Sequence, residues 1–268
     1  KILVSAYACD PYRGSEPGVG WDAVCRIARK HQVYVLADDH NRAGWERAAA
    51  EQMIPPDVQV RFLRREAHCS ENRFIAHLQS WLSYRAFTRL VLQAADEWHQ
   101  EECFDLCHQV TIAAWRMPSP LWRLPIPFVW GPIGGAGYIP PSFRGMLSVT
   151  ARLFERLRDF NTTITLRSSG FQSCIRKTAL VFAANEETEL LLKPYRGKHP
   201  MVRLPIASIP REKAEKFRRT QELTTGNGPL RLFAGGNLEG RKAVSLALRA
   251  LAIVKDAGVD FHYTLAGG

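Results

Sequence analysis

The sequence lacks the long apolar run of about 20 residues that a membrane-spanning helix needs. Arg, Asp, Glu or Gln interrupts every candidate stretch. The opening residues 1–6 form an apolar stretch too short for a secretion signal, and they lead directly into a polar loop. We therefore expect neither a membrane span nor a leader in this sequence.

Cysteines are few and show no paired spacing. The chain has 6 of them, and only Cys103 and Cys107, with His108 adjacent, suggest a metal ligand set. A second cluster that would complete a tetrahedral site is missing. The pattern favours buried free thiols, no metal site and a reducing cytoplasmic location.

Signatures of nucleic-acid binding are also missing, although the net charge is +10. The sequence contains no helix-turn-helix, zinc-finger or aromatic-stacking pattern. The charge favours a nucleotide diphosphate or anionic lipid head groups as partners, and a solvated basic surface is the alternative.

What the sequence does contain is a regular alternation of short apolar runs and longer amphipathic stretches, which is typical of βα units around a parallel sheet. The predicted strands are residues 2–6, 33–37, 58–63, 104–107, 128–130, 179–183 and 201–204. The predicted helices are residues 21–28, 42–52, 72–98, 146–166 and 186–192. This order predicts an α/β fold with a doubly wound parallel sheet.

A change of composition predicts a domain boundary. Residues 206–228 lose periodicity and become rich in Pro, Lys and Gly, so they are expected to link a first domain, 1–205, to a second unit, 229–268. In that unit we expect strands 230–234 and 261–266 around a helix, 241–255. One βαβ piece is too small to close a core, so we interpret it as the start of a second, truncated Rossmann-like domain.

In a parallel sheet, ligands bind at the carboxyl ends of the strands, which indicates two candidate places in the first domain. The loop Arg13-Gly14-Ser15-Glu16 precedes a helix, where a glycine lets backbone N–H groups approach an anion. Glu16 is also a first-turn acid that suits the helix dipole, and we favour this role over a catalytic one. His108 ends a strand and could bind a sugar hydroxyl, or it could be a structural histidine.

The third candidate place is the glycine-rich loop of residues 235–240, which ends in Arg241 and Lys242. Two cations at a predicted helix start oppose the helix dipole at a cost of about 0.3–1 kcal/mol each, and a bound diphosphate would offset this cost. The P-loop pattern is absent, so ATPase chemistry is not indicated. The loops at Gly14 and Gly131 do not match G-x-G-x-x-G, which disfavours an NAD-dependent oxidoreductase.

Three separated segments resemble family 4 glycosyltransferases, which are retaining enzymes of GT-B fold. They are residues 8–21 (ACDPYRGSEPGVGW), residues 105–111 (DLCHQVT) followed by 130–135 (WGPIGG), and residues 233–243 (FAGGNLEGRKA). The resemblance implies two Rossmann-like domains, the second incomplete, and sugar transfer from a nucleotide-sugar donor without a metal or other cofactor. We expect Trp21 and Trp130 to be core residues rather than sugar-stacking platforms.

The resemblance also implies roles for single residues. Gly14 matches a glycine that approaches the donor phosphate and sugar, and His108 matches a histidine near the donor sugar. Arg241 and Lys242 match the pair that holds the diphosphate. Lower-ranked candidates for the acceptor or its loops are Arg13, Ser15, Glu16, Gly134 and Gly135.

The sequence departs from the family pattern at three points. Arg13 stands where the family often has a glycine, and Gly236 stands where it commonly has an arginine. The family's E-x(7)-E segment would lie beyond Gly268, so we expect the chain to be inactive alone.

The sequence thus predicts a retaining, hexosyltransferase-like enzyme of polysaccharide or glycolipid synthesis, acting on a sugar or lipid-linked acceptor. Basic residues on the predicted helix 146–166 alternate with Leu147, Leu153, Phe154 and Leu157, which could place the enzyme peripherally on the inner, anionic membrane face. A solvated outer helix is the alternative. A non-catalytic GT-B-like binding protein is the main functional alternative.

Overall fold

A computed structural model describes residues 1–64, 73–112, 114–206, 214–218, 228–236 and 242–267, with backbone only for residues 73–85. The chain divides into two compact units. The first comprises residues 1–137 and 164–207, and the second comprises 138–163 and 208–268.

The first unit is built on a seven-stranded sheet in the order β3-β2-β1-β4-β5-β6-β7. Every neighbouring pair in it is parallel. The strands are β1 (Ile2–Ser5), β2 (Val33–Asp38), β3 (Val58–Leu63), β4 (Leu106–Gln109), β5 (Phe128–Ile133), β6 (Leu180–Ala183) and β7 (Met201–Arg203). The predicted parallel sheet is confirmed.

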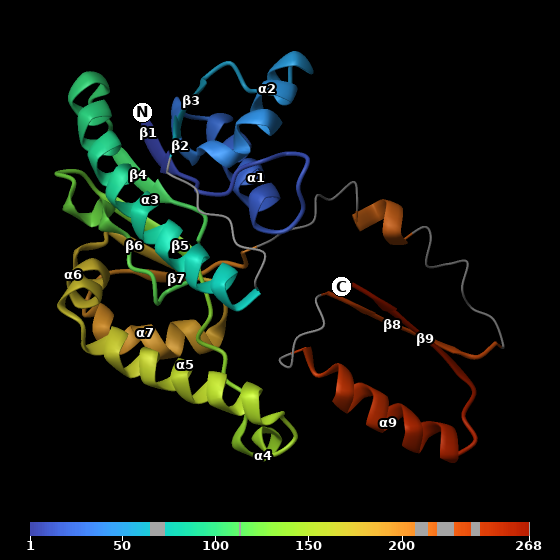
Figure 1. Ribbon diagram of the computed structural model, residues 1–268. Helices are drawn as coiled ribbons and strands as arrows, with labels where there is room; N and C mark the ends of the chain where they lie inside the picture. The colour runs from blue at the N-terminus through green and yellow to red at the C-terminus, as the bar shows by residue number, and fades with distance from the viewer. Residues whose placement is uncertain (65–72, 113, 207–213, 219–227, 237–241, 268) are drawn as a thin grey trace. The chain divides into compact units, whose positions relative to one another are not determined.

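Helices cover both faces of this sheet, because successive apolar side chains of the strands point to opposite faces and both faces are buried. The helices of this unit are α1 (Glu16–Ala28), α2 (Arg42–Ala50), α3 (Arg73–Glu102), α6 (Ser169–Lys177) and α7 (Glu186–Arg196), with the 3-10 turns η1 (Asp39–Asn41) and η2 (Pro120–Arg123). The helix α4 (Pro141–Arg144) and most of α5 (Val149–Arg167) belong to the second unit. The sheet of this unit and its helices are drawn in Figure 1. Val4 packs with α1 and α2 in one core, and Leu3 packs with α3, α6 and α7 in the other. Helices on both faces confirm the doubly wound class.

The two tryptophans assigned to the core are confirmed there. Trp130 is completely buried in the core that includes α3, and Trp21 is buried against Trp45 in the other core, with 4.9 Å between the ring centroids.

The strand β5 corrects the expected loop at residues 131–137, because it continues through Gly131 to Ile133. Gly131 has φ +120°, and a Cβ there would lie 2.4 Å from the carbonyl oxygen of Phe182 on β6. The glycine therefore permits a close approach of two strands and an irregular register between Trp130 and Ile133. The short helix α6 was not predicted.

The second unit contains a parallel pair of strands, β8 (Leu230–Gly235) and β9 (Phe261–Ala266), and the helix α9 (Val244–Asp256) between them in sequence. This confirms the predicted βαβ order. The helix begins at Val244 rather than Arg241, after Ala243 in the left-handed region with φ 53°. Within the described residues, no helix combines the length and hydropathy needed to cross a bilayer.

Candidate functional site

The strand order places a switch point between β1 and β4. From β1 the chain proceeds outward to β2 and β3, and from β4 it proceeds in the opposite direction to β7. Loops at the carboxyl ends of β1 and β4 therefore diverge, which opens a crevice at this edge of a doubly wound sheet. We take this edge as the candidate site.

The loop after β1 is fixed to its neighbours by hydrogen bonds. Asn41 accepts from the Cys9 N–H at 3.1 Å and donates to the Tyr7 carbonyl at 2.8 Å. The Trp45 indole donates to the Cys9 carbonyl at 2.8 Å, and the Thr111 hydroxyl accepts from the Ala8 N–H at 3.2 Å. Because Asn41 and Trp45 are buried, this loop is a rigid border of the site.

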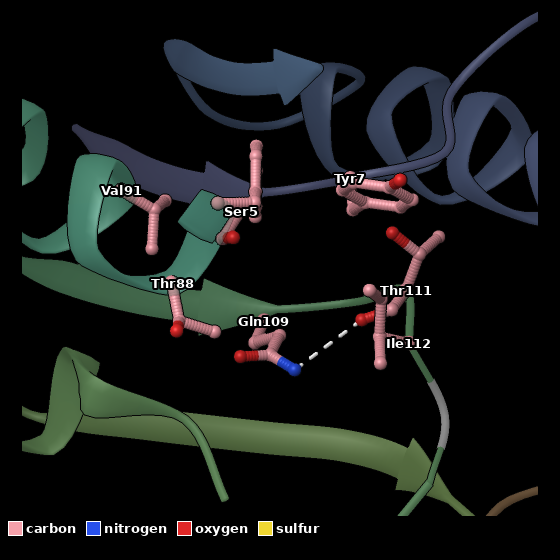
Figure 2. A pocket seen from close by; sticks show the side chains of 8 residues that line it. Ser5, Tyr7, Thr88, Val91, Gln109, Thr111 and Ile112 are labelled. Carbon is pink, nitrogen blue, oxygen red and sulfur yellow. Dashed lines mark hydrogen bonds between the residues drawn. The ribbon is translucent and has the colours of Figure 1, made fainter. Parts of the chain in front are cut away.

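Buried polar side chains lie at the crevice under α3. Ser5, Gln109 and Thr111 are buried, and with Tyr7 and Thr88 they line a narrow hollow (Figure 2). Gln109 donates from Nε2 to the Thr111 carbonyl at 3.3 Å. Among the described residues, the Ser5 hydroxyl and Gln109 Oε1 have no hydrogen-bond partner. A hydroxyl and an amide oxygen can each hydrogen-bond a ligand hydroxyl or amide that reaches the hollow.

Two strained residues lie side by side in this border. The Glu16 carboxylate accepts from the Ile112 N–H at 2.5 Å, so the loop after β4 is tied to the start of α1. Ile112 has φ 59° and Ser15 has φ 62°, both in the left-handed region that β-branched and other non-glycine residues rarely adopt. Strained backbone of this kind clusters at functional sites. Besides its place in the first turn of α1, Glu16 thus holds the loop after β4 in position.

An oriented histidine follows β2 at the same edge. Asp38 is 2% exposed, and its Oδ1 lies 2.5 Å from His40 Nδ1 and accepts the His40 N–H at 3.1 Å. The His40 ring is 5.4 Å from the Tyr7 ring, which packs edge-on against Phe87 at 4.9 Å. A buried carboxylate at Nδ1 fixes the ring and leaves Nε2 for a ligand.

The loop residues Arg13 and Gly14 are exposed. A Cβ on Gly14 would meet nothing within 4 Å, whereas one on Gly18 would lie 2.9 Å from the Arg13 carbonyl oxygen. The tight turn before α1 therefore depends on Gly18. The predicted contact of Gly14 with a phosphate stays a prediction.

His108 lies on the sheet face opposite to Gln109, because the two are adjacent on β4. Its Nε2 donates to the Gly131 carbonyl at 2.8 Å, and its ring is 6.1 Å from that of Phe182. It lines an open hollow of about 390 Å³ with Leu106 and Leu180. Burial lowers its pKa, against the opposing effect of the Gly131 hydrogen bond, so the ring is neutral at pH 7.

Gly14 lines neither this hollow nor the one in Figure 2. The structure therefore places Gly14 and His108 apart from the polar hollow, and the predicted role of His108 stays a prediction. Cys107 and His108, which suggested a metal site, lie on opposite faces of the sheet, Cys107 in the core with α3 and His108 in the open hollow. Among the described residues, no three His, Cys, Asp or Glu side chains come together as a metal site.

Gly134 and Gly135 follow β5 and hold the loop after β4. Gly134 forms a parallel bridge with Ala114 and accepts from the Trp115 N–H at 3.2 Å. Gly135 has φ +90°, and its carbonyl accepts from Arg116 at 2.5 Å. These two residues thus shape the border of the crevice through their backbone.

In the second unit, glycines and Lys242 meet at the carboxyl ends of β8 and β9. A Cβ on Gly267 would lie 2.1 Å from the Gly236 carbonyl oxygen, and one on Gly236 would lie 3.6 Å from Lys242 Nζ. Both glycines have positive φ, +127° at Gly236 and +145° at Gly267. An ammonium beside a compact glycine turn suits an anion. Arg241 lies outside the described residues.

Sequence reasoning missed Tyr7, Asp38, His40 and Gln109. A signal for the Asp38–His40 pair was available, because Asp38-Asp39-His40 directly follows the apolar strand 33–37 and would emerge at the carboxyl edge. Nothing local indicated Tyr7 or Gln109, which gain their significance from the pairing of β1 with β4.

No protein-family description matches this chain, and no curated protein matches it. Among solved structures it is similar to a UDP-glucose: anthocyanidin 3-O-glucosyltransferase in complex with UDP, with a TM-score of 0.45 and 11% identity. The match covers 89% of this chain and 60% of that one, so the chain spans three-fifths of that structure's length.

Proposed function

We propose that the protein is a glycosyltransferase of GT-B type, which moves a sugar from a nucleotide-sugar donor to an acceptor hydroxyl with retention, in polysaccharide or glycolipid synthesis. One observation carries the proposal. The hollow between β1 and β4 presents the neutral hydrogen-bonding groups of Ser5 and Gln109, and Tyr7 in its lining lies 5.4 Å, ring to ring, from the oriented His40. Such groups suit a ligand rich in hydroxyls, whose binding depends on hydrogen bonds rather than charge.

The donor diphosphate is assigned to the second unit. Lys242 beside the Gly236 turn would bind it, with Arg241 as the second cation that the resemblance implies. These charges would stabilise the leaving group as its negative charge develops, in place of a metal ion. The resemblance further assigns Gly14 and His108 to the donor. A contact between His108 and the donor requires that the donor enter the hollow that His108 lines with Leu106 and Leu180.

A binding experiment tests the donor assignment. UDP, GDP and ADP are titrated into the protein by calorimetry, with the Lys242→Ala variant and, as a control of equal charge change, Lys255→Ala on α9. Because Lys242→Ala loses a charge-assisted hydrogen bond, it should bind the preferred nucleotide about tenfold more weakly, whereas Lys255→Ala should bind it as the wild type does. Equal weakening in both variants, or no binding of any nucleotide, contradicts the assignment. Binding without sugar transfer by the complete enzyme would identify a non-catalytic binding protein.

The Asp38–His40 pair is assigned to the acceptor. In a retaining transfer the acceptor approaches from the side where the diphosphate leaves, so a diphosphate oxygen can take the acceptor proton and His40 only orients the hydroxyl. In the complete enzyme, His40→Ala should then raise the KM for the acceptor about tenfold and leave kcat within about threefold. If kcat instead falls about 10²–10⁴-fold in this variant, and the wild-type product has the inverted configuration at the sugar carbon, then His40 is a general base and the proposed retention is wrong.

The helix α5 is assigned to an anionic membrane surface. Val149, Leu153, Leu157, Phe160 and Ile164 are all at least half exposed, and spacings of three and four place them on one stripe. Along one edge of the stripe lie exposed arginines without an acidic partner among the described residues, namely Arg152, Arg156 and Arg167. An apolar stripe with flanking cations is the pattern of helices that lie in a membrane interface.

Vesicle flotation tests this assignment. The protein should float with vesicles that contain phosphatidylglycerol and not with phosphatidylcholine alone. Leu153→Ser with Phe160→Ser should abolish flotation, whereas Thr163→Ser on the same helix should not. Equal binding to both lipids, or flotation that survives the double substitution, contradicts the assignment.

A further inference from the structure

The amino edge of the sheet, opposite to the candidate site, carries a wide hollow. Its volume is about 810 Å³ and it opens to solvent. Three segments that lead into neighbouring strands form it: residues 122–127 before β5, the end of α6 before β6, and the turn before β7. We call it the amino-edge hollow, and its polar and aromatic lining consists of Trp122, Arg123, Arg176, Lys177 and His199.

The charges of this lining have one sign. Segments 119–127, 168–179 and 196–204 contain no Asp or Glu. Arg123, Arg176 and Lys177 are exposed, and in the described part of the chain none of them forms an ion pair. Like charges gathered without counterions repel each other, and a bound anion would relieve this repulsion.

An aromatic ring holds two of these cations close together. The Arg123 guanidinium carbon lies 4.6 Å from the centroid of the Trp122 ring, and Lys177 Nζ lies 4.7 Å from it. Cation–π contacts at this range are favourable, so the ring partly offsets the repulsion. The half-buried ring also gives the hollow an apolar wall.

A buried arginine fixes the segments that carry the other cations. Arg196 is 2% exposed, and its guanidinium donates to the carbonyls of Ile175 and Thr178, each at 2.6 Å, to Ala179 at 3.1 Å and to Pro200 at 2.9 Å. Burial lowers its pKa to about 10, which leaves it charged at neutral pH. These bonds hold the end of α6 against the turn at Pro200. The backbone that carries Arg176, Lys177 and His199 is therefore preorganised.

We propose that the amino-edge hollow binds the phosphate groups of a phosphorylated ligand whose apolar or planar part packs on Trp122. Arg123, Arg176 and Lys177 supply charge-assisted hydrogen bonds to the phosphate oxygens, and His199 adds a further donor. The ligand is a soluble phosphate compound or a phospholipid head group, which share this chemistry. The inference does not rest on the proposed transferase function, because its residues lie at the other edge of the sheet.

The test uses the full chain with Arg241→Ala and Lys242→Ala as background, so that the proposed donor loop cannot contribute. The same background carries Leu153→Ser and Phe160→Ser, so that the apolar stripe of α5 does not bind the vesicles. Sodium pyrophosphate is titrated by calorimetry at low salt, and flotation is measured with vesicles of phosphatidic acid in phosphatidylcholine. Arg176→Ala with Lys177→Ala removes two exposed cations of the hollow. Arg249→Ala with Lys255→Ala removes two exposed cations of α9 and is the control of equal charge.

The hollow variant should weaken binding of at least one probe about tenfold, and the control should leave it within about twofold. Loss confined to pyrophosphate identifies a soluble ligand, and loss confined to vesicles identifies a lipid head group. Equal loss in both variants overturns the proposal in favour of a diffuse basic field. Absence of binding to both probes also overturns it. Thermal unfolding of both variants within about 2 °C of the background protein shows that the fold is kept.

Discussion

The two edges of the seven-stranded sheet are built in opposite ways. At the carboxyl edge, polar side chains such as Gln109 and Asp38 are buried and neutral or paired, and the backbone is strained at Ser15 and Ile112. At the amino edge, Arg176 and Lys177 are exposed and without ion pairs in the described part of the chain, around an open hollow. The carboxyl edge is thus suited to ligands that bind through hydrogen bonds, and the amino edge is suited to ligands that carry negative charge.

The comparison has a physical consequence. Interactions between exposed charges are screened over about 8–10 Å at physiological salt, whereas buried hydrogen bonds are screened much less. Substitutions that break the packing or hydrogen bonds of either edge should lower the free energy of unfolding, whereas added salt should weaken ligand binding at the amino edge alone. Four predictions sharpen this contrast.

The largest effect is expected at Arg196, which holds the amino edge together. Arg196→Met leaves the carbonyls of Ile175 and Thr178 buried without their donor, and the free energy of unfolding should fall by about 3 kcal/mol or more. Urea unfolding measures this loss. Arg152→Met on the exposed side of α5 is the control and should stay within about 0.5 kcal/mol. Similar losses in both would show that Arg196 has no special role.

The second prediction concerns the frame of the carboxyl edge. A Cβ on Gly20 would lie 2.1 Å from the Ala8 carbonyl oxygen, so Gly20→Ala should push the loop after β1 outward and cost about 1–3 kcal/mol. Gly170→Ala is the matched control in α6, where a Cβ meets nothing within 4 Å. It should be neutral or stabilise by up to about 1 kcal/mol, because alanine favours a helix. Urea midpoints compare the two, and a stable Gly20→Ala protein would contradict the tight contact.

Salt should separate the two edges. Raising sodium chloride from about 50 to about 200 mM should weaken pyrophosphate binding at the amino-edge hollow several-fold, because screening grows as the Debye length shortens. The unfolding midpoint of the wild-type protein, which depends on buried contacts, should change little over the same range. Binding that is insensitive to salt would show that charge is not what the amino edge uses.

The smallest effect is expected from His108. Its folded pKa is lowered from 6.5 by burial, so between the folded pKa and 6.5 the unfolded chain binds more protons than the native protein. Stability should therefore fall as pH drops from about 7 through 6.5 toward the folded pKa. His108→Gln removes this titration, so the urea midpoints of this variant at pH 7.5 and pH 5 should differ less than those of the wild type. An unchanged pH dependence would show that His108 does not titrate differently on folding.

Local patterns determined most of the elements of this protein. The strands β3 and β9 begin and end at the predicted residues, because alternating side chains and flanking turn residues are properties of a few neighbouring positions. The strand β5 was predicted too short, since its continuation past Gly131 depends on the close approach of Phe182 on another strand.

Only the tertiary structure decided which side chains share a site. Gln109 meets Ser5 because β4 pairs with β1, and His108 faces away from both because it occupies the alternate position on β4. Residues that lie more than 50 positions apart in the sequence, such as Trp122 and Lys177, meet through the order of strands in the sheet. Strand order is fixed by long-range packing, and no periodicity within one segment encodes it.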